Sequence, residues 1–397
     1  MKRSLYIFLM AAALLAAYSC SKDERLDTEE QPISFGSYQA RATKANTDGF
    51  ADGSYLPDGS SFGVFGFFHS GTTSTPGSWN TSAQNHPNFM LNQKVTVSES
   101  SGTYTYDYTP ARFWPAAGNR ISFYAYYPYV ANSSTYTASG VTDGSYAQYQ
   151  LQTYMNKTTD GQGSFGFDVA YEAKDQIDFM ISDLCADQNK KENILTSNST
   201  TVQFDFHHVL AQVRIATLNV VNDNPDVTIT PREIRFSGIA VHGECSVAEN
   251  WSTKTEQGKV TNTFTWSNQL TTRVGNTIEG VHVEYTGSKR TGETDAEYEI
   301  RKKQNYLMMI PQSFTDEATI TIIYDVVRNN NSAGEHYSYT GNEVSAPLNT
   351  AKVGGTPLTG WEQNKIYNYT ANISLTGIEL TATYVDWGHG GQDLDLE

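Results

Sequence analysis

The sequence predicts an all-β protein made of two β-sandwich domains in tandem. Its 397 residues correspond to about two domains of ordinary size. Only 18% of the residues are charged, while 25 are Tyr and 18 are Phe, a composition that favours strands over helices. Short alternating or apolar runs recur along the chain with Gly, Asp and Pro turn signals between them, which is typical of sandwiches.

Residues 1–19 are predicted to be a lipoprotein signal peptide. Lys2 and Arg3 precede an apolar run over residues 5–17, which is too short to cross a bilayer. Small residues then lead to Cys20, so the segment resembles a bacterial lipoprotein signal in which Cys20 becomes the acylated first residue, for example with palmitate. The alternative is an ordinary signal peptide with an incidental cysteine.

Residues 20–32 are polar and charged, and they are predicted to form a flexible tether. Within them Lys22, Asp23 and Glu24 resemble the short acidic signal that directs lipoproteins of Bacteroidota to the outer face of the cell; a solvated linker is the alternative. A polar stretch at 186–200 then marks the boundary between the two predicted domains. These are an N-terminal sandwich over 33–195 and a C-terminal sandwich over 196–397.

Strands are predicted wherever β-branched and aromatic residues alternate or form a short apolar run. In the first half they cover 33–38, 63–68, 94–97, 103–108, 121–128 and 178–181. In the second half they cover 202–206, 233–239, 263–266, 306–310, 319–327, 367–375 and 378–387. Only 209–215 and part of 171–177 admit a helix.

The charge and the cysteine content of the chain argue against several kinds of partner and site. The chain carries 43 Asp and Glu against 27 Lys and Arg, a net charge of −16, which should repel nucleic acid and anionic lipid headgroups. Beyond Cys20, only Cys185 and Cys245 remain, and they form either one disulfide or two buried thiols. No CxxC motif supports a cysteine-based metal site.

Several short segments together resemble the fimbrillin family of Bacteroidota, the pilus subunits and their relatives. Their order and their coverage from about residue 33 to 387 carry the resemblance, behind the lipoprotein signal. The segments are Arg112-Phe113-Trp114-Pro115 with 121–128, Asp178-Phe179-Met180, 204–215 with His208 inside it, Ile310-Pro311-Gln312, and 361–369 with Asp386-Trp387 near the end.

The resemblance implies two transthyretin-like sandwich domains and a role in a fimbria. It also implies an outer-membrane lipoprotein precursor whose N-terminal strand is removed by an arginine-specific protease. The exposed groove then accepts a strand from another pilus subunit, of the same or a different kind. A sandwich that lacks one strand has unpaired backbone groups and an open apolar slot, so a donated strand satisfies both needs. A host or bacterial surface receptor is a further implied partner.

The sequence offers a site for each of these steps. Arg41 follows the strand predicted over 33–38, so cleavage there would remove the anchor and the strand together; an exposed linker charge is the alternative. The alternating side chains of the last strand form the candidate donor strand, although this segment is equally the second domain's own last strand. They are Ile378, Leu380, Ala382 and Tyr384.

No catalytic, metal or cofactor site is predicted, and the chain is not expected to be an enzyme. The pattern Gly161-x-Gly163-x-x-Gly166 lacks the βαβ context of a dinucleotide site. His207 and His208 are adjacent, so on a strand they point to opposite faces, and one of them should pack inside the domain. A surface lipoprotein that binds glycans through exposed Trp251 and Trp266 is the alternative function, and a secreted β-sandwich hydrolase is a third.

Overall fold

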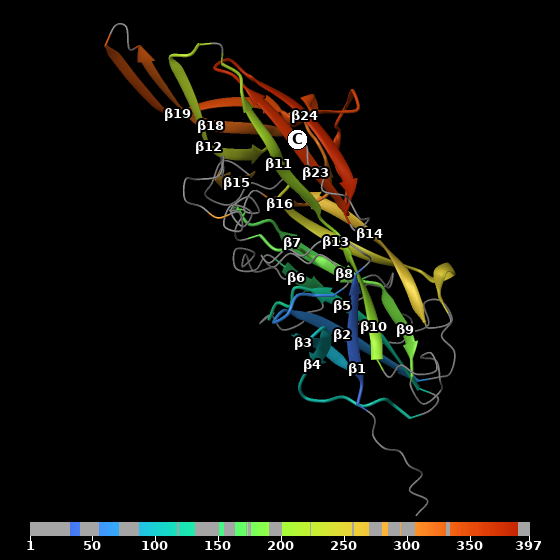
Figure 1. Cartoon of the computed structure of the whole chain (residues 1–397). Helices are drawn as coiled ribbons and strands as arrows, with labels where there is room; N and C mark the ends of the chain where they lie inside the picture. The colour runs from blue at the N-terminus through green and yellow to red at the C-terminus, as the bar shows by residue number, and fades with distance from the viewer. Residues whose placement is uncertain are drawn as a thin grey trace, which may run out of the picture.

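A computed structural model of the chain shows an elongated all-β protein (Figure 1). The structure describes residues 32–39, 55–70, 87–116, 119–131, 151–154, 163–171, 173, 176–189, 201–222, 224–255, 258–269, 280–284, 294, 306–330 and 334–387. The named elements within this part are strands, apart from single 3₁₀ turns at Trp251–Thr253 and Leu348–Thr350. The predicted all-β fold is confirmed. No helix in the described part of the chain is long and apolar enough to span a membrane.

One large sheet of twelve strands occupies the lower half of Figure 1. Nine of them follow the order β1-β10-β8-β5-β9-β14-β13-β7-β6, while β2 joins β5, β3 joins β2 and β4 joins β3. The strands are β1 (Ser34–Gln39), β2 (Ser61–Ser70), β3 (Met90–Ser100), β4 (Thr103–Asp107), β5 (Asn119–Tyr127), β6 (Leu151–Tyr154), β7 (Gly163–Asp168), β8 (Met180–Ser182), β9 (Leu184–Gln188), β10 (Thr201–His208), β13 (His242–Asn250) and β14 (Lys259–Gln269).

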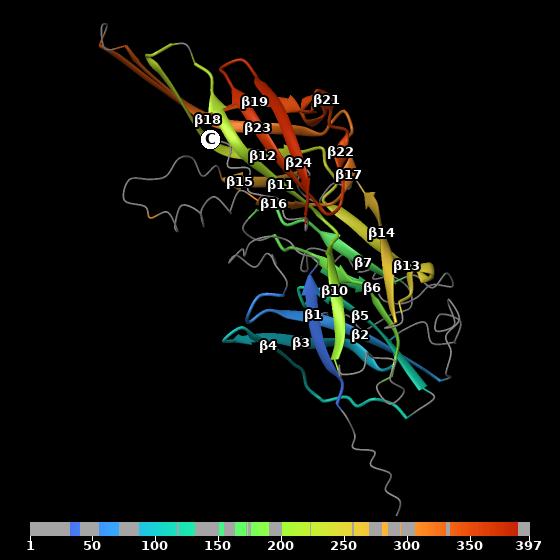
Figure 2. The ribbon, with the colours of Figure 1, turned by 45° about the vertical axis from the view of Figure 1, so that its right-hand side comes forward.

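Two further sheets pack face to face in the upper half of the molecule (Figure 1, Figure 2). The first has the order β16-β11-β23-β24-β20-β21, and the second has the order β15-β12-β18-β19. Their strands, with the small pair β17 and β22, are β11 (Ala211–Val220), β12 (Val227–Ser237), β15 (Gly280–Glu284), β16 (Tyr306–Met309), β17 (Gln312–Ser313), β18 (Thr319–Asn330), β19 (Glu335–Pro347), β20 (Lys352–Val353), β21 (Thr356–Pro357), β22 (Gly360–Trp361), β23 (Lys365–Ile373) and β24 (Ile378–Asp386).

The buried side chains form two apolar clusters, and β5 separates them. Phe123 and Tyr127 on one face of β5 belong to the cluster around β1, β2, β3 and β10. Tyr124 and Tyr126 on the other face belong to the larger cluster, which continues into the upper sheets. Because β5 is buried on both faces, its sequence is an almost continuous apolar run rather than an alternation.

Strands on both sides of residue 195 share the twelve-stranded sheet. β10, β13 and β14 follow that residue in sequence, yet they pair with strands that precede it. The chain leaves this sheet after β10, forms β11 and β12 in the upper sheets, and returns for β13 and β14. The boundary between 33–195 and 196–397 stays a prediction, as does the transthyretin-like topology.

The helix admitted over 209–215 is wrong, because β11 begins at Ala211. β11 pairs with β16 on one side and with β23 on the other, so neighbouring strands decide its conformation. The segment with the Gly161-x-Gly163-x-x-Gly166 pattern also contains a strand that was not predicted. Gly163 and Gly166 lie on β7, which packs Phe165 and Phe167 into the larger cluster.

One of the adjacent histidines joins the lower sheet to the last strand of the chain. His208, at the end of β10, is 6% exposed, and its ring stacks on Trp387 with 3.9 Å between centroids. Its Nδ1 lies 3.0 Å from the Oδ1 of Asp178, whose side chain is fully buried. The prediction that one histidine of this pair packs inside the domain is confirmed.

Candidate functional site

The candidate site is the seat of β1 at the edge of the lower sheet. β1 pairs with β10 in parallel over its whole length, from Ser34 opposite Thr201 to Gln39 opposite Phe206. The strand comes first in the order of the sheet, so its backbone ladder has one neighbour in the described part of the chain. A strand with one neighbour can leave without breaking any other pair in the sheet.

The side chain of Phe35 fills an aromatic pocket beneath β1. Phe35 is 2% exposed. Its ring lies 5.2 Å from that of Tyr108, 5.6 Å from that of Phe204 and 5.7 Å from that of Phe123, measured between centroids. Such aromatic pairs add stabilisation beyond the area that they bury. Phe35 is therefore the main apolar anchor of β1, and Ile33, also 2% exposed, is the second.

Polar contacts fix the position of β1 along β10. The Ile33 amide donates to the Arg112 carbonyl at 2.8 Å, and the Ile33 carbonyl accepts from the Tyr108 hydroxyl at 2.7 Å. Further along, the hydroxyls of Ser37 and Tyr106 lie 3.0 Å apart. Since Ile33, Phe35 and Ser37 alternate along the strand, they share the face that points into the protein.

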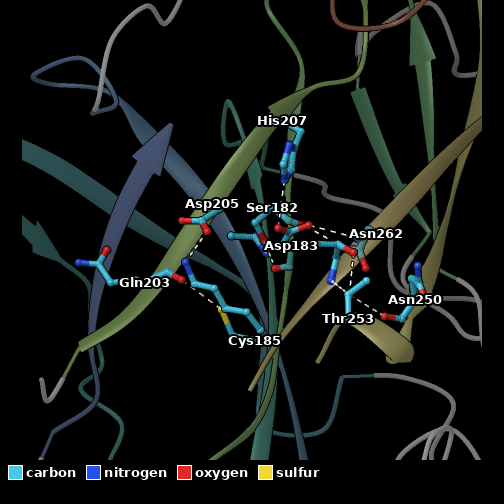
Figure 3. Close-up of polar contacts among 12 residues, drawn as sticks. Ser182, Asp183, Cys185, Gln203, Asp205, His207, Asn250, Thr253 and Asn262 are labelled. Atoms are coloured by element: carbon cyan, nitrogen blue, oxygen red, sulfur yellow. Dashed lines mark hydrogen bonds and ion pairs between the residues drawn. The ribbon is translucent and has the colours of Figure 1, made fainter. Parts of the chain in front are cut away.

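The side of β10 away from β1 is held by a group of polar contacts (Figure 3). The Asp183 amide donates to the Asp205 carbonyl at 2.9 Å, and the Asp183 carboxylate lies 3.2 Å from His207 Nε2. The backbone amide of Asn262 donates to the same carboxylate at 3.2 Å, and Lys259 pairs with Asp205. These contacts attach β10 to β8, β9 and β14 independently of β1.

The proximity of Ser182, Asp183 and His207 in Figure 3 does not form a nucleophile and base pair. The Ser182 hydroxyl is buried; it accepts from the Ala125 amide at 2.9 Å and donates to the Asp183 carbonyl at 2.9 Å. A catalytic serine instead needs its hydroxyl bonded to the histidine and open to substrate. The contacts of these three residues therefore stabilise the fold.

Cys185 and Cys245 are both free and buried. The Cys185 thiol donates to the Gln203 carbonyl at 3.2 Å (Figure 3). Burial raises the pKa of both thiols, so they stay protonated and unreactive. Of the two arrangements left open by the sequence, the structure has the pair of buried thiols.

Asp187 on β9 is the centre of an ion-pair group next to these contacts. Its carboxylate lies 3.1 Å from His69 Nε2 and also contacts Lys254 Nζ. Burial by itself raises the pKa of this carboxyl, but the hydrogen bonds from His69 and Lys254 outweigh it, so the pKa of Asp187 lies below its ordinary value. The carboxylate is thus the form that stabilises the fold.

Removing one partner of Asp187 should change the acid sensitivity of the protein. A carboxyl with a depressed folded pKa contributes stability above its unfolded pKa of about 3.9 and loses that stability as the pH falls through the folded value. We expect Lys254→Met to lower the urea midpoint near neutral pH and to flatten its fall below about pH 4. Lys365→Met, which breaks a pair with the exposed Glu362, should leave the acid slope unchanged. Parallel pH profiles for wild type and Lys254→Met would contradict this assignment.

The structure places the other predicted site residues as follows. Cys20 and Arg41 lie outside the described residues. The candidate donor residues all lie on β24, which pairs with β23 along its whole length; Leu380 and Ala382 are buried, and Tyr384 is 43% exposed. In this structure β24 thus lies inside its own sheet, between β23 and β20, and its role as a donor stays a prediction.

The two tryptophans proposed as glycan contacts are half-buried. Trp266 donates its indole N–H to the Val209 carbonyl at 2.8 Å, and its ring meets Phe167 edge-on. Trp251 lies at the end of β13, with Lys254 Nζ 5.4 Å from its ring centroid. The structure does not bring the two rings into contact with each other, and glycan binding by them stays a prediction.

Sequence reasoning identified β1 as a strand but missed the residues that hold it. Tyr106 and Tyr108 were assigned only to an alternating strand, although their hydroxyls bond β1. A pattern of hydroxyl-bearing aromatics at alternate positions of an edge strand was the available signal. Their partner in β1 lies about seventy positions away, so the sequence alone does not show the pairing.

Comparison with known proteins identifies the family of the chain. A family model described as fimbrillin-like matches residues 41–387. The chain belongs to the fimbrillin-like family. This fimbrillin-like protein is also 31% identical over 243 residues to the fimbrium subunit Fim1C of Phocaeicola vulgatus, an alignment that covers 58% of this chain and 55% of the relative. The chain thus spans about half the length of that curated relative.

Solved structures of fimbrial proteins are similar to this fimbrillin-like chain at low identity. A fimbrial protein from Bacteroides vulgatus is 20% identical with a TM-score of 0.47, over 90% of this chain and 99% of that one. The fimbrilin of Porphyromonas gingivalis is 10% identical with a TM-score of 0.39, over 91% and 99% of the two chains. The family resemblance predicted from the sequence is confirmed by the family model.

Proposed function

We propose that this fimbrillin-like chain is a lipid-anchored subunit of a fimbria that assembles by exchanging β1 for a strand of another subunit. Its role is structural and adhesive rather than catalytic. Membership of the family supports the fimbrial role, and the name of the relative, a fimbrium subunit, agrees with it. The lipid anchor at Cys20 and the outer-membrane location rest on the signal sequence.

The observation that carries the exchange is the seat of β1. Phe35 and, just before β1, Ile33 are buried in the apolar cluster, while β10 is the strand that pairs with β1 in the described part of the chain. Loss of β1 would leave an apolar slot and an unpaired edge on β10, and a strand from another subunit would satisfy both. Repeated contacts of this head-to-tail kind do not close, so they build a filament. In this chain β24, with apolar side chains at alternate positions, is the candidate donor.

Arg41 supports the exchange because it follows β1 so closely. The last residue of β1 is Gln39, so cleavage after Arg41 would separate the whole strand from the rest of the chain. Cleavage at Arg25 would remove the anchor and leave β1 in place. An arginine-specific protease acting at Arg41 therefore couples release from the membrane to opening of the slot.

Arginine-specific digestion of the chain that begins at Cys20 tests the proposal. We expect a new N-terminus at Ala42 and, in native sizing, ladders or filaments. Arg41→Lys should abolish both results, while the matched control Arg25→Lys should leave both unchanged. A cut at Arg41 that yields only stable monomers would contradict assembly by exchange and favour the alternative, a surface lipoprotein that binds glycans through Trp251 and Trp266.

A further inference from the structure

The β18–β19 hairpin projects from the upper end of the molecule (Figure 1, Figure 2). Along β18, the side chains on its inner face become steadily more exposed: Ile322 is buried, Val326 is half-buried and Arg328 is exposed. Opposite the last two, on β19, Tyr339 is 58% exposed and Tyr337 is 45% exposed. The inner face of the sheet thus continues into solvent as an aromatic surface.

The free edge of the sheet lies beside these tyrosines. β19 is the last strand of its sheet and pairs only with β18 in the described part of the chain. A strand edge of this kind is a template for pairing with another chain. The pairing of β19 with β18 is interrupted at Thr340 and Gly341. Gly341 has a φ of 70° and donates its amide to the Asp325 carboxylate at 3.1 Å. The stretch next to the turn that pairs without interruption is therefore 335–339.

We propose that this stretch of β19 pairs with the same stretch of a second copy of the chain, antiparallel and centred on Ser338. Ser338 is the residue between Tyr337 and Tyr339, the two exposed aromatic residues of this stretch. Pairing about this centre sets Tyr337 opposite Tyr339 of the second copy. It generates a two-fold contact that closes on itself.

The sequence of β19 is complementary to itself in this register. Tyr337 and Tyr339 meet their counterparts as aromatic cross-strand pairs, which are among the stabilising kinds. On the other face Ser338 lies opposite its own counterpart and His336 lies opposite Thr340, so no like charges are opposed there. The exposed rings of the two copies therefore cover one another.

The contact between the two copies is small, so the affinity of the dimer is expected to be low. A short strand with two large side chains from each copy buries less than the roughly 1,600 Å² of a standard interface. We therefore expect free chains to dimerise only at high concentration. The contact strengthens where many copies are held close together, as on one surface, because the effective concentration is then high. It does not involve β1, so it is independent of the function proposed above.

Cysteine cross-linking of the full chain carrying Cys20→Ser tests the register. Directly opposed residues of an antiparallel pair have Cα atoms about 4.5–5.5 Å apart, which lies within the range of about 4.4–6.8 Å for a disulfide. We expect Ser338→Cys to give a covalent dimer under mild oxidation. The matched control Ser345→Cys, exposed on the same strand beyond Gly341, should stay monomeric. Cys185 and Cys245 are buried and do not compete.

Loss of the tyrosines should remove the dimer. Tyr337→Ser with Tyr339→Ser, added to Ser338→Cys, should reduce the cross-linking rate at least tenfold, whereas Tyr384→Ser, at an exposed tyrosine on another sheet, should not change it. Sedimentation of the chain without cysteine substitutions should show concentration-dependent dimers that the double tyrosine variant lacks. Equal cross-linking at Ser338→Cys and Ser345→Cys, or cross-linking that survives the double variant, would overturn the proposal.

Discussion

Replacement of Phe35 by Ala is expected to lower the free energy of unfolding by about 3–5 kcal/mol, the usual cost of deleting a buried phenylalanine side chain. The ring fills the pocket between Tyr108, Phe123 and Phe204. Because β1 has one backbone neighbour, the loss falls on the attachment of this strand. Urea unfolding of the full chain measures the total effect.

Hydrogen exchange shows which strands are destabilised by Phe35→Ala. In Phe35→Ala the amides that link β1 and β10 should lose protection before those of β23, since β10 pairs with β1 and β23 does not. The matched control is Ser34→Ala on the same strand, which removes one part-buried hydroxyl contact with Thr201 and should cost about 1 kcal/mol or less. Equal destabilisation by the two variants would contradict the role of Phe35 as the anchor.

Replacement of Trp387 by Ala is the second large expected effect, a loss of about 3 kcal/mol or more. Trp387 is 5% exposed, covers the ring of His208, and donates its amide to the Asn364 carbonyl at 2.7 Å. Its loss would open the buried pair of His208 and Asp178 to water. Thermal unfolding of the full chain measures this effect.

Trp387→Phe is the matched control, because a smaller ring can still stack on His208. It should cost clearly less than Trp387→Ala. Asp178→Asn tests the same junction from the opposite side, since it removes the charge that faces His208 and keeps the volume of the side chain. A Trp387→Ala protein as stable as the wild type would mean that the last strand does not depend on this stack.

The sequence predicted the strands whose pattern is local. Residues 319–327 and 121–128 were predicted from their own β-branched and aromatic runs, and the structure has β18 and β5 there. β19 was missed because its alternation of Tyr337 and Tyr339 is short and ends at Gly341. β7 was also missed, because glycine is rare inside strands and two of its six residues are Gly163 and Gly166.

The candidate site was less accessible to prediction because its contacts are distant in sequence. Ser34 of β1 lies opposite Thr201, which is 167 positions away along the chain. The periodicity of a strand does not indicate which other strand it pairs with. Parallel pairing is also not indicated by any turn signal in the sequence. The strand and the neighbouring arginine were therefore predictable, whereas the pocket of Phe35 required the structure.

The parallel pairing of β1 gives any assembly built through this edge a direction. β1 runs from the lower end of the molecule toward the upper sheets (Figure 1). A replacement strand that keeps this direction enters from the lower end, so the body of the subunit that supplies it lies below. Each subunit then points the same way as its neighbours, and the two ends of the fibre differ in what they expose. Growth at one end and attachment at the other become chemically distinct events.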